Sequence, residues 1–349
     1  MNNVTNLNTL KRTIASIFNT QEISFDCIQP LWSNYGSLYR CYLSDASVKS
    51  VIVKHVQLPK NDNSSPASNR SLSHMRKLRS YEVELYWYQH YCSSPIKNLG
   101  KLPEHFYSEY SNDEFILVIE DLVDAGFTQL GSNTPSSQPP LLEAEDSDFV
   151  SLANIHTGLS WLAHMHAAFL HTKQPTGLWP NGSYWHLETR PSELNAITDS
   201  RIKHAAPAIA QQLRNTRFST LIHGDAKVAN FCFNAQGNKA AAVDFQYVGG
   251  GCGIQDVMLF LSSCLNSEDC FRLENELLDY YFSELKLHCQ NTTKNSDATE
   301  LNKLEEDWRS RYCFAWADFV RFLSGWNSNH WKLHPYALAQ TELALKQLK

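Results

Sequence analysis

The sequence predicts an α+β fold of two lobes, with a small antiparallel β-sheet in the N-terminal lobe and a mainly helical C-terminal lobe. Two observations predict it. Short runs rich in β-branched residues, at residues 51–56 and 115–119, lie in the first third of the chain. Long amphipathic runs with helical spacing dominate after residue 150. The 349 residues suffice for about two domains. We expect lobes at residues 1–121 and 122–349, joined by a connector near residue 122.

The composition is that of a globular protein with a sizeable core, since 43% of the residues are hydrophobic and 19% are charged. No stretch approaches the ~20 continuous apolar residues that cross a bilayer, and no apolar signal-peptide core follows the polar N-terminus. The nine cysteines include no Cys-x-x-Cys pair, which suits a reducing compartment and argues against a disulfide framework or a zinc site. We therefore expect a cytoplasmic protein with no membrane partner.

The charge distribution does not predict a nucleic-acid partner, because the formal net charge is −6 and no long basic run occurs. One polar segment carries the densest basic patch. Such a patch could contact a phosphate, but a solvated loop is its more common role. Its members are Arg70, Arg76, Lys77 and Arg79.

In the N-terminal lobe, residues 27–56 are predicted to form strands with turns between them, and residues 57–73 a long loop rich in Asn, Ser and Pro. Helical spacing begins with Tyr81, Leu85 and Tyr88, at i, i+4 and i+7. Residues 115–119 form another buried strand.

In the C-terminal lobe, the elements follow a second polar stretch, residues 131–138 with Pro139 and Pro140 after it. We expect a strand–loop–strand block over residues 221–245, between the helices predicted at residues 152–170 and 256–265. Amphipathic runs predict helices over residues 152–170, 256–265, 270–287 and 304–323.

The strongest functional signal is LIHGDAKVAN at residues 221–230, with Asp244 fourteen residues beyond Asn230. Phosphoryl transfer from ATP needs in-line positioning, metal ions on the phosphates, and a carboxylate that accepts the hydroxyl proton. Asp225 can supply that base, and Asn230, five residues on, one metal ligand. Asp244, at the end of the next strand, can supply a second ligand, and such oxygen ligands suit Mg²⁺. The alternative is that His223 and Asp225 only cap a turn and that Asp244 only ends a strand.

Other parts of an ATP site occur in the order that this chemistry expects. Lys54 lies in a predicted strand, where its ammonium could reach the α- and β-phosphates. Glu84, on the following helix, could pair with Lys54; Glu82 competes, but Glu84 shares the apolar face of that helix. The loop that covers the phosphates should precede Lys54, and residues 32–37 are the candidate, although a single glycine makes them an ordinary turn.

Two further segments follow the same logic. Lys227 stands two residues after Asp225, and we expect it to contact the transferring γ-phosphate. The GGGCG run at residues 249–253 suggests a phosphate cradle, but it follows Asp244 and precedes no lysine-bearing helix, and no Walker A pattern is present. A flexible loop that leads into the helix at Asp256 is the favoured interpretation.

Together these residues resemble the kinase-like phosphotransferases. The His-Gly-Asp prefix at residues 223–225 resembles the aminoglycoside phosphotransferase and choline kinase group, and within it the ecdysteroid-kinase-like branch. The resemblance implies a protein-kinase-like bilobal fold, ATP, Mg²⁺ and a hydroxyl-bearing small-molecule acceptor. It also implies that Glu120 and Leu122 lie in the hinge whose backbone binds adenine, and that Asp256 braces the catalytic loop. The chain departs from the family in its poor glycine loop and in Gln246, where choline kinases tend to have Glu.

The acceptor should bind in the C-terminal lobe, where the last predicted helices gather aromatic residues around Asp318. An aromatic box with a carboxylate suits a quaternary ammonium, and also a flat apolar ring system such as a sterol. Aromatic residues at helical spacing are, however, more often core. The acceptor therefore stays open among choline-like, aminoglycoside-like and sterol-like alcohols. The tryptophans concerned are Trp308, Trp316, Trp326 and Trp331.

Two other classes of protein compete with a small-molecule kinase. A metal-dependent hydrolase could use His164, His166 and His171, but the first two point to different sides of a predicted helix and no His-Glu-x-x-His motif occurs. Metal retained on purification would favour the hydrolase, because Mg²⁺ washes out and a hydrolytic zinc usually does not. A non-catalytic nucleotide-binding module would bind ATP without turnover. The sequence predicts neither the oligomeric state nor a preference for ATP over GTP.

Overall fold

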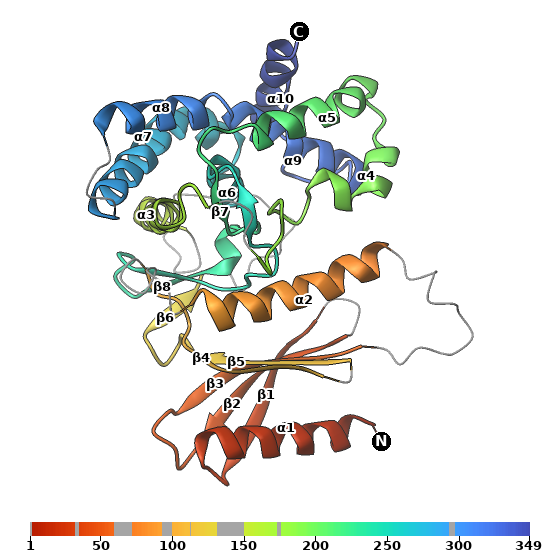
Figure 1. Cartoon of the computed structure of the whole chain (residues 1–349), viewed down its shortest axis with the longest axis vertical. Coiled ribbons are helices and arrows are strands. Elements are labelled where there is room, and N and C mark those ends of the chain that lie inside the picture. The colour runs from red at the N-terminus through yellow and green to blue at the C-terminus, as the bar shows by residue number, and fades with distance from the viewer. Residues whose placement is uncertain are drawn as a thin grey trace.

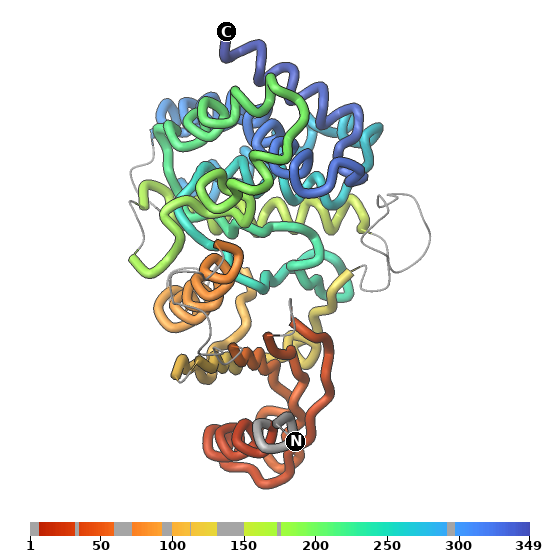
Figure 2. Tube along the Cα trace, turned by 90° about the vertical axis from the view of Figure 1, so that its right-hand side faces the viewer, coloured from red at the N-terminus to blue at the C-terminus, as the bar shows by residue number. Residues whose placement is uncertain are grey.

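The computed structural model describes residues 2–31, 35–58, 72–92, 100–111, 113–130, 150–172, 176–292 and 297–349. Its layers stack along the long axis, as Figures 1 and 2 show. Helix α1 (Asn2–Phe18) covers the outer face of a five-stranded sheet, and helix α2 (Leu72–His90) lies between the sheet and the helical C-terminal part. This arrangement confirms the predicted α+β fold with a β-sheet N-terminal part and a helical C-terminal part.

The N-terminal sheet is antiparallel throughout, in the order β1-β2-β3-β5-β4. Its strands are β1 (Ile23–Pro30), β2 (Gly36–Leu43), β3 (Ser50–Gln57), β4 (His105–Ser111) and β5 (Glu114–Glu120). Side chains alternate between the two faces, and both faces are covered. Val51 and Val53 pack with α1, whereas Val56 packs on the side of α2. The same alternation directs Lys54 towards α2.

The C-terminal part consists of helices around two small sheets. Strand β7 (Thr220–Ile222) pairs with β10 (Gly249–Gly251), and β6 (Phe127–Gln129), β8 (Phe231–Asn234) and β9 (Ala240–Ala242) form the other sheet. The helices are α3 (Leu152–Ala168), α4 (Pro191–Ala196), α5 (Ser200–Arg214), α6 (Ile254–Cys264), α7 (Ser267–Thr292), α8 (Ala298–Arg309), α9 (Tyr312–Trp326) and α10 (Pro335–Gln347), with the 3₁₀ turns η4 (Leu187–Thr189) and η5 (Val228–Asn230).

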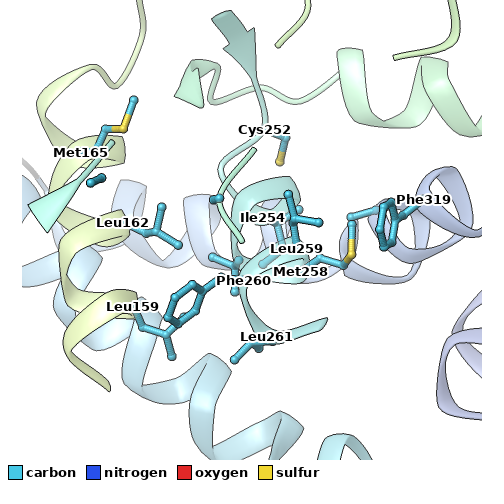
Figure 3. Packing of buried hydrophobic residues seen from close by; sticks show 14 of the residues in the cluster. Leu159, Leu162, Met165, Cys252, Ile254, Met258, Leu259, Phe260, Leu261 and Phe319 are labelled. Atoms are coloured by element: carbon cyan, nitrogen blue, oxygen red, sulfur yellow. The ribbon is translucent and has the colours of Figure 1, made fainter. Parts of the chain in front are cut away.

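Helix α6 is buried on all sides and anchors this part of the molecule. Figure 3 shows Leu159 of α3 beside Phe260 of α6, and Met258 of α6 beside Phe319 of α9. A Cβ atom on Gly158 would lie 2.2 Å from the Phe260 ring, so α3 can approach α6 this closely only with glycine there. Because α6 begins beside the catalytic loop, this packing fixes the position of the loop.

Two sequence predictions were wrong. The run predicted as one helix over residues 304–323 forms two helices that break at Ser310 and Arg311. The Arg311 guanidinium donates to the carbonyl oxygens of Asp307 and Gln212, which satisfies backbone acceptors at the ends of α8 and α5. The predicted flexible loop at residues 249–253 is in part strand β10, where Gly249 lies so close to Trp179 that a Cβ atom would come within 2.3 Å of its carbonyl oxygen.

Several other predictions concern segments outside the described residues. These are most of the loop at residues 57–73 with Arg70, the polar stretch at residues 131–140, and residues 32–34 of the candidate glycine loop. No disulfide joins the nine cysteines, all of which lie within the described residues. No described helix has both the length and the apolar character needed to cross a membrane.

Candidate active site

Asp256, in the first turn of α6, fixes the loop that joins β7 to β8, residues 223–230. Asp256 is fully buried and accepts hydrogen bonds from the backbone N–H groups of His223, at 2.5 Å, and Gly224, at 3.0 Å. His166 of α3 lies 3.2 Å from the same carboxylate through Nε2. A buried carboxylate that accepts several N–H groups fixes a loop strongly, because the loss of either partner leaves buried polar groups unsatisfied. This geometry is the one that the resemblance implied for Asp256.

Gly224 occupies a position that other residues cannot take without strain. Its φ is +78°, and a Cβ atom would lie 2.1 Å from the carbonyl oxygen of Tyr247 and 2.6 Å from the amide nitrogen of Ser183. The segments around residues 183 and 247 therefore press directly on the catalytic loop. The His-Gly-Asp prefix thus has a steric basis here.

His223 supports the loop through both ring nitrogens. Its Nε2 lies 3.0 Å from the Val243 carbonyl oxygen, and its Nδ1 lies 3.2 Å from the Asp225 amide nitrogen. The carbonyl can only accept and the amide can only donate, so these partners assign a neutral imidazole with its proton on Nε2. His223 therefore links the loop at residues 223–230 with the segment that leads to Asp244.

Asp225 has one oxygen that is held and one that is unpartnered. Its Oδ2 accepts from Lys227 Nζ at 2.9 Å and from Asn230 Nδ2 at 3.1 Å. Its Oδ1 is buried and has no hydrogen-bond partner among the described residues. Burial raises the pKa of Asp225, although the positive charge of Lys227 opposes that effect. A donor from outside the chain, such as an acceptor hydroxyl, would satisfy Oδ1.

Asp244 and Asn230 face the same region with oxygen atoms. Both side-chain hydrogen bonds of Asn230 use its amide nitrogen, which leaves its carbonyl oxygen for a cation. Asp244 has a φ of 66°, a strained conformation for a non-glycine residue and one that clusters at functional sites. Burial by itself would raise the pKa of Asp244, but the charges of Lys54 and Lys227 outweigh it and lower that pKa. The carboxylate is therefore ionised and suited to bind a metal ion.

Lys54 pairs with Glu84 and not with Glu82. Its Nζ lies 2.7 Å from Glu84 Oε2 and 3.2 Å from Asp244 Oδ1. Glu82 instead pairs with Arg79, 3.1 Å away on the exposed side of α2. Burial alone would lower the pKa of Lys54, but the two carboxylates outweigh it and raise that pKa. Lys54 is therefore a cation that connects the N-terminal sheet with Asp244.

Gln246, which departs from the family pattern, joins this cluster. Its Nε2 lies 3.4 Å from Glu84 Oε2, so it donates to the carboxylate that also holds Lys54. A carboxylate at position 246 would instead repel Glu84, whose pKa burial already raises. The sequence offered no signal for this contact beyond the departure itself.

The predicted hinge follows β5. The Glu120 carboxylate turns towards Lys101, 2.6 Å away, so only the backbone of Glu120 can serve a nucleotide. The Leu122 carbonyl accepts from the Phe127 N–H, while the Leu122 amide has no acceptor in the described part of the chain. Asp121 is buried and accepts from Arg40 and Ser50, which fixes the segment between them. The Leu122 amide thus remains as a donor for an adenine ring.

The aromatic cluster of the last helices divides into core and surface. Trp308 and Trp316 are completely buried, whereas Trp326 is 51% exposed and Trp331 is half-buried. The Asp318 carboxylate, proposed above as part of an ammonium box, accepts from Arg321 Nε at 2.8 Å and from Trp185 Nε1 at 3.0 Å. Both oxygens of the Asp318 carboxylate are therefore already bound within the protein.

The donor set fits Mg²⁺ and a nucleotide, and does not suggest a zinc site. In the described ranges, no group of three or more His, Cys, Asp or Glu side chains could hold a metal ion by itself. Carbonyl and carboxylate oxygens from Asn230 and Asp244 leave most of a Mg²⁺ shell to phosphate and water, which is the usual arrangement.

Neither of the two cavities found coincides with this cluster. One of about 610 Å³ lies between α5, β10 and residues 180–188, and one of about 620 Å³ lies beside Lys101 and Trp161. Lys54, Asp225 and Asp244 line neither cavity, so the candidate site rests on the contacts of the loop and not on a cavity.

Comparisons with known proteins agree with the fold and the motifs. Residues 181–293 match the ecdysteroid kinase-like family. A microcompartment-associated aminopropanol kinase has a similar structure, with a TM-score of 0.52, 12% identity, and coverage of 98% of this chain and 97% of the kinase. An ethanolamine kinase from Plasmodium vivax gives a TM-score of 0.50 at 11% identity, with coverage of 93% and 82%. No curated protein matches the sequence. These findings confirm the predicted bilobal kinase-like fold and the resemblance to the ecdysteroid-kinase-like branch.

Proposed function

We propose that this chain, similar to the ecdysteroid kinase-like family over residues 181–293, is an ATP- and Mg²⁺-dependent phosphotransferase acting on a hydroxyl group of a small molecule. The observation that carries the proposal is the position of Lys54, whose ammonium contacts both Glu84 and Asp244. One cation thus joins the N-terminal sheet, α2 and the metal-binding motif. Phosphate oxygens are the natural further ligands of such a cation.

In the proposed reaction, the acceptor hydroxyl lies against Asp225 Oδ1, the buried oxygen without a partner. The hydroxyl oxygen forms a bond to the γ-phosphorus of ATP as the bond from that phosphorus to the bridging oxygen of ADP breaks. The hydroxyl proton passes to Asp225, and the products are ADP and a phosphate monoester. A positioned base of this kind contributes ~10²–10⁴-fold in rate.

The other residues position the nucleotide. Lys54 binds the α- and β-phosphates, and Glu84 orients Lys54. Asn230 and Asp244 hold Mg²⁺, which neutralises charge on the phosphate oxygens. Lys227 contacts the transferring γ-phosphate, and burial does not deprotonate it, because the charge of Asp225 raises its pKa. The backbone of Glu120 and Leu122 binds adenine.

The test measures ADP release with Mg²⁺-ATP across a panel of alcohols: choline, ethanolamine, aminoglycosides, sterols and sugar alcohols. An Asp225→Asn variant is the blank, since it keeps the shape of the side chain and removes the base. Acceptor-stimulated turnover that the variant loses is the expected result. ATP binding without any turnover would instead indicate a non-catalytic nucleotide-binding module, and failure to bind Mg²⁺-ATP would refute the proposal.

Two broader assignments accompany this function. We propose that the lobes divide at residues 1–121 and 122–349, since β5 ends at Glu120 and the segment after it leads into the C-terminal part. We also propose a cytoplasmic location, because no disulfide joins the described cysteines and a reducing compartment keeps thiols reduced.

A further inference from the structure

Lys332, between α9 and α10, is a buried ammonium with few partners. It is 9% exposed. Its Nζ lies 3.2 Å from Ser262 Oγ, and it stands over the rings of Phe319 and Trp331, at 5.6 and 5.4 Å from their centroids. No carboxylate forms an ion pair with it in the part of the chain that the structure describes. Ser262 is the one hydrogen-bond acceptor found for it among the described residues, so two of its three N–H donors have no acceptor there.

Lys332 is linked to the catalytic loop through α6. Its partner Ser262 is on α6, and the next residue, Ser263, accepts a hydrogen bond from the Val228 amide of that loop at 2.8 Å. The charges of Lys227 and Asp225 both act on Lys332. Burial is the main reason that the pKa of Lys332 falls to about 8, which agrees with an ammonium that lacks a carboxylate partner.

The surroundings on this side of Asp225 are basic and aromatic. Arg190 is buried, stands over the ring of Phe322 and donates to the Tyr184 carbonyl oxygen. Tyr184 in turn donates its backbone N–H to the Gly224 carbonyl oxygen. Arg190 also pairs with Glu193 of α4, 3.1 Å away, and the Asp318 carboxylate is bound by Arg321 and Trp185. Both of these carboxylates are therefore engaged, so apart from Asp225 itself a cationic acceptor would meet the ammonium of Lys332.

We infer that the acceptor is an apolar hydroxy acid: Lys332 binds its anionic group, the rings of Phe319 and Trp331 contact its body, and Asp225 receives its hydroxyl. The inference rests on the proposed function and deepens it by naming the class of acceptor. The transferred phosphate replaces the hydroxyl hydrogen, so the product keeps the original acid group and gains a phosphate monoester. The aminopropanol and ethanolamine kinases of similar fold are named for amino alcohols, which carry the opposite charge.

The test is a calorimetric titration with three benzyl alcohols that differ only in the para substituent: para-(hydroxymethyl)benzoate, para-(aminomethyl)benzyl alcohol and para-methylbenzyl alcohol. Each is titrated into the full chain with and without Mg²⁺-ADP. The carboxylate should bind about tenfold more tightly than the other two, the gain expected from one charge-assisted hydrogen bond. Lys332→Met should abolish this preference, Lys332→Arg should keep most of it, and Lys303→Met, at an exposed lysine of α8, should leave it unchanged.

Four results would overturn the inference. The first is that the ammonium compound binds as tightly as the carboxylate or more tightly, and the second is that Lys332→Met keeps the preference for the carboxylate. The third is that the carboxylate does not bind up to about 20 mM. The fourth is that Lys332→Met loses as much affinity for Mg²⁺-ADP as for the carboxylate. The last would assign Lys332 to the nucleotide phosphates. Because the titration needs no turnover, failure of the kinase proposal appears separately, as absent nucleotide binding or absent ADP release.

Discussion

Replacing Lys332 by Met should stabilise the protein at neutral pH, and the gain should shrink as the pH rises. Lys332 is 9% exposed and has no carboxylate partner among the described residues, so its charge is buried at a cost. A Met side chain fills nearly the same volume between Phe319 and Trp331 without that charge. Replacing buried charges by apolar groups of similar volume is often stabilising.

The size of the expected gain in stability follows from the pKa of Lys332 in the unfolded chain and in the folded chain. Burial lowers the pKa of Lys332 from 10.5 to about 8. Between these values the unfolded chain binds more protons than the folded chain, so the free energy of unfolding of the native protein rises with pH through this window. Each tenfold change in acidity corresponds to about 1.4 kcal/mol, so below pH 8 the buried charge costs about 3 kcal/mol. By pH 9.5, about 2 kcal/mol of this cost should be recovered.

The assay is urea unfolding of the native protein and of Lys332→Met at pH 7 and pH 9.5, with Lys303→Met as the exposed control. The stability advantage of Lys332→Met should be about 3 kcal/mol at pH 7 and about 2 kcal/mol smaller at pH 9.5. The charged or titratable groups that act on Lys332 are Lys227, Asp225, Cys264 and Cys270, and their effect is already contained in its pKa of about 8. Groups that titrate independently of Lys332 are shared by both proteins and cancel in the difference. The reasoning would be refuted if Lys332→Met were less stable than the native protein at pH 7. It would also be refuted if the difference in the free energy of unfolding between the two proteins were the same at pH 7 and pH 9.5.

Two further predictions test the catalytic cluster. Glu84→Gln should lower kcat/KM for Mg²⁺-ATP by about tenfold and the free energy of unfolding by roughly 1–3 kcal/mol, because it breaks a buried ion pair of Lys54 that Asp244 only partly replaces. Glu82→Gln should change stability by less than about 0.5 kcal/mol, and equal effects of the two variants in kinetics and urea unfolding would contradict the assignment. Gly224→Ala should cost about 2–4 kcal/mol in urea unfolding, since its φ is +78° and its Cβ would strike the Tyr247 carbonyl oxygen; a loss under 1 kcal/mol would show that the loop can shift.

The sequence predicted those parts of the molecule where local chemistry and periodicity agree. Spacing along one helix face selected Glu84 over Glu82, and the structure pairs Glu84 with Lys54. The bilobal fold was predictable because β-branched runs and amphipathic runs occupy different parts of the chain. Spacing also identified Asp225 and Asn230 as neighbours, since a loop of five residues keeps both on one turn. The structure joins them through hydrogen bonds from Asn230 Nδ2.

The sequence could not predict what depends on contacts between distant segments. Helix α1 was missed although Leu7, Leu10 and Ile14 recur at helical spacing, because the Asn and Thr residues among them are weak helix formers. The break between α8 and α9 escaped because the apolar stripe continues across it, and Arg311 ends the helix through long-range carbonyl contacts. Gly249 was interpreted as part of a flexible loop, although its role is steric, against Trp179. Lys332 belongs to no motif, and only the fold brings it within the electrostatic influence of Asp225.

The two sides of the catalytic loop treat buried charge in opposite ways. On the nucleotide side, Lys54 is compensated within the chain by Glu84 and Asp244, so the site is assembled before any ligand binds. On the acceptor side, Lys332 and one oxygen of Asp225 are buried without such compensation. Polar groups left unsatisfied in a folded protein reduce stability, and a ligand that satisfies them recovers that free energy as affinity. A hydroxyl group that donates to Asp225 and an anionic group that pairs with Lys332 would together satisfy the groups on this side. The charge pattern therefore points to a hydroxy acid.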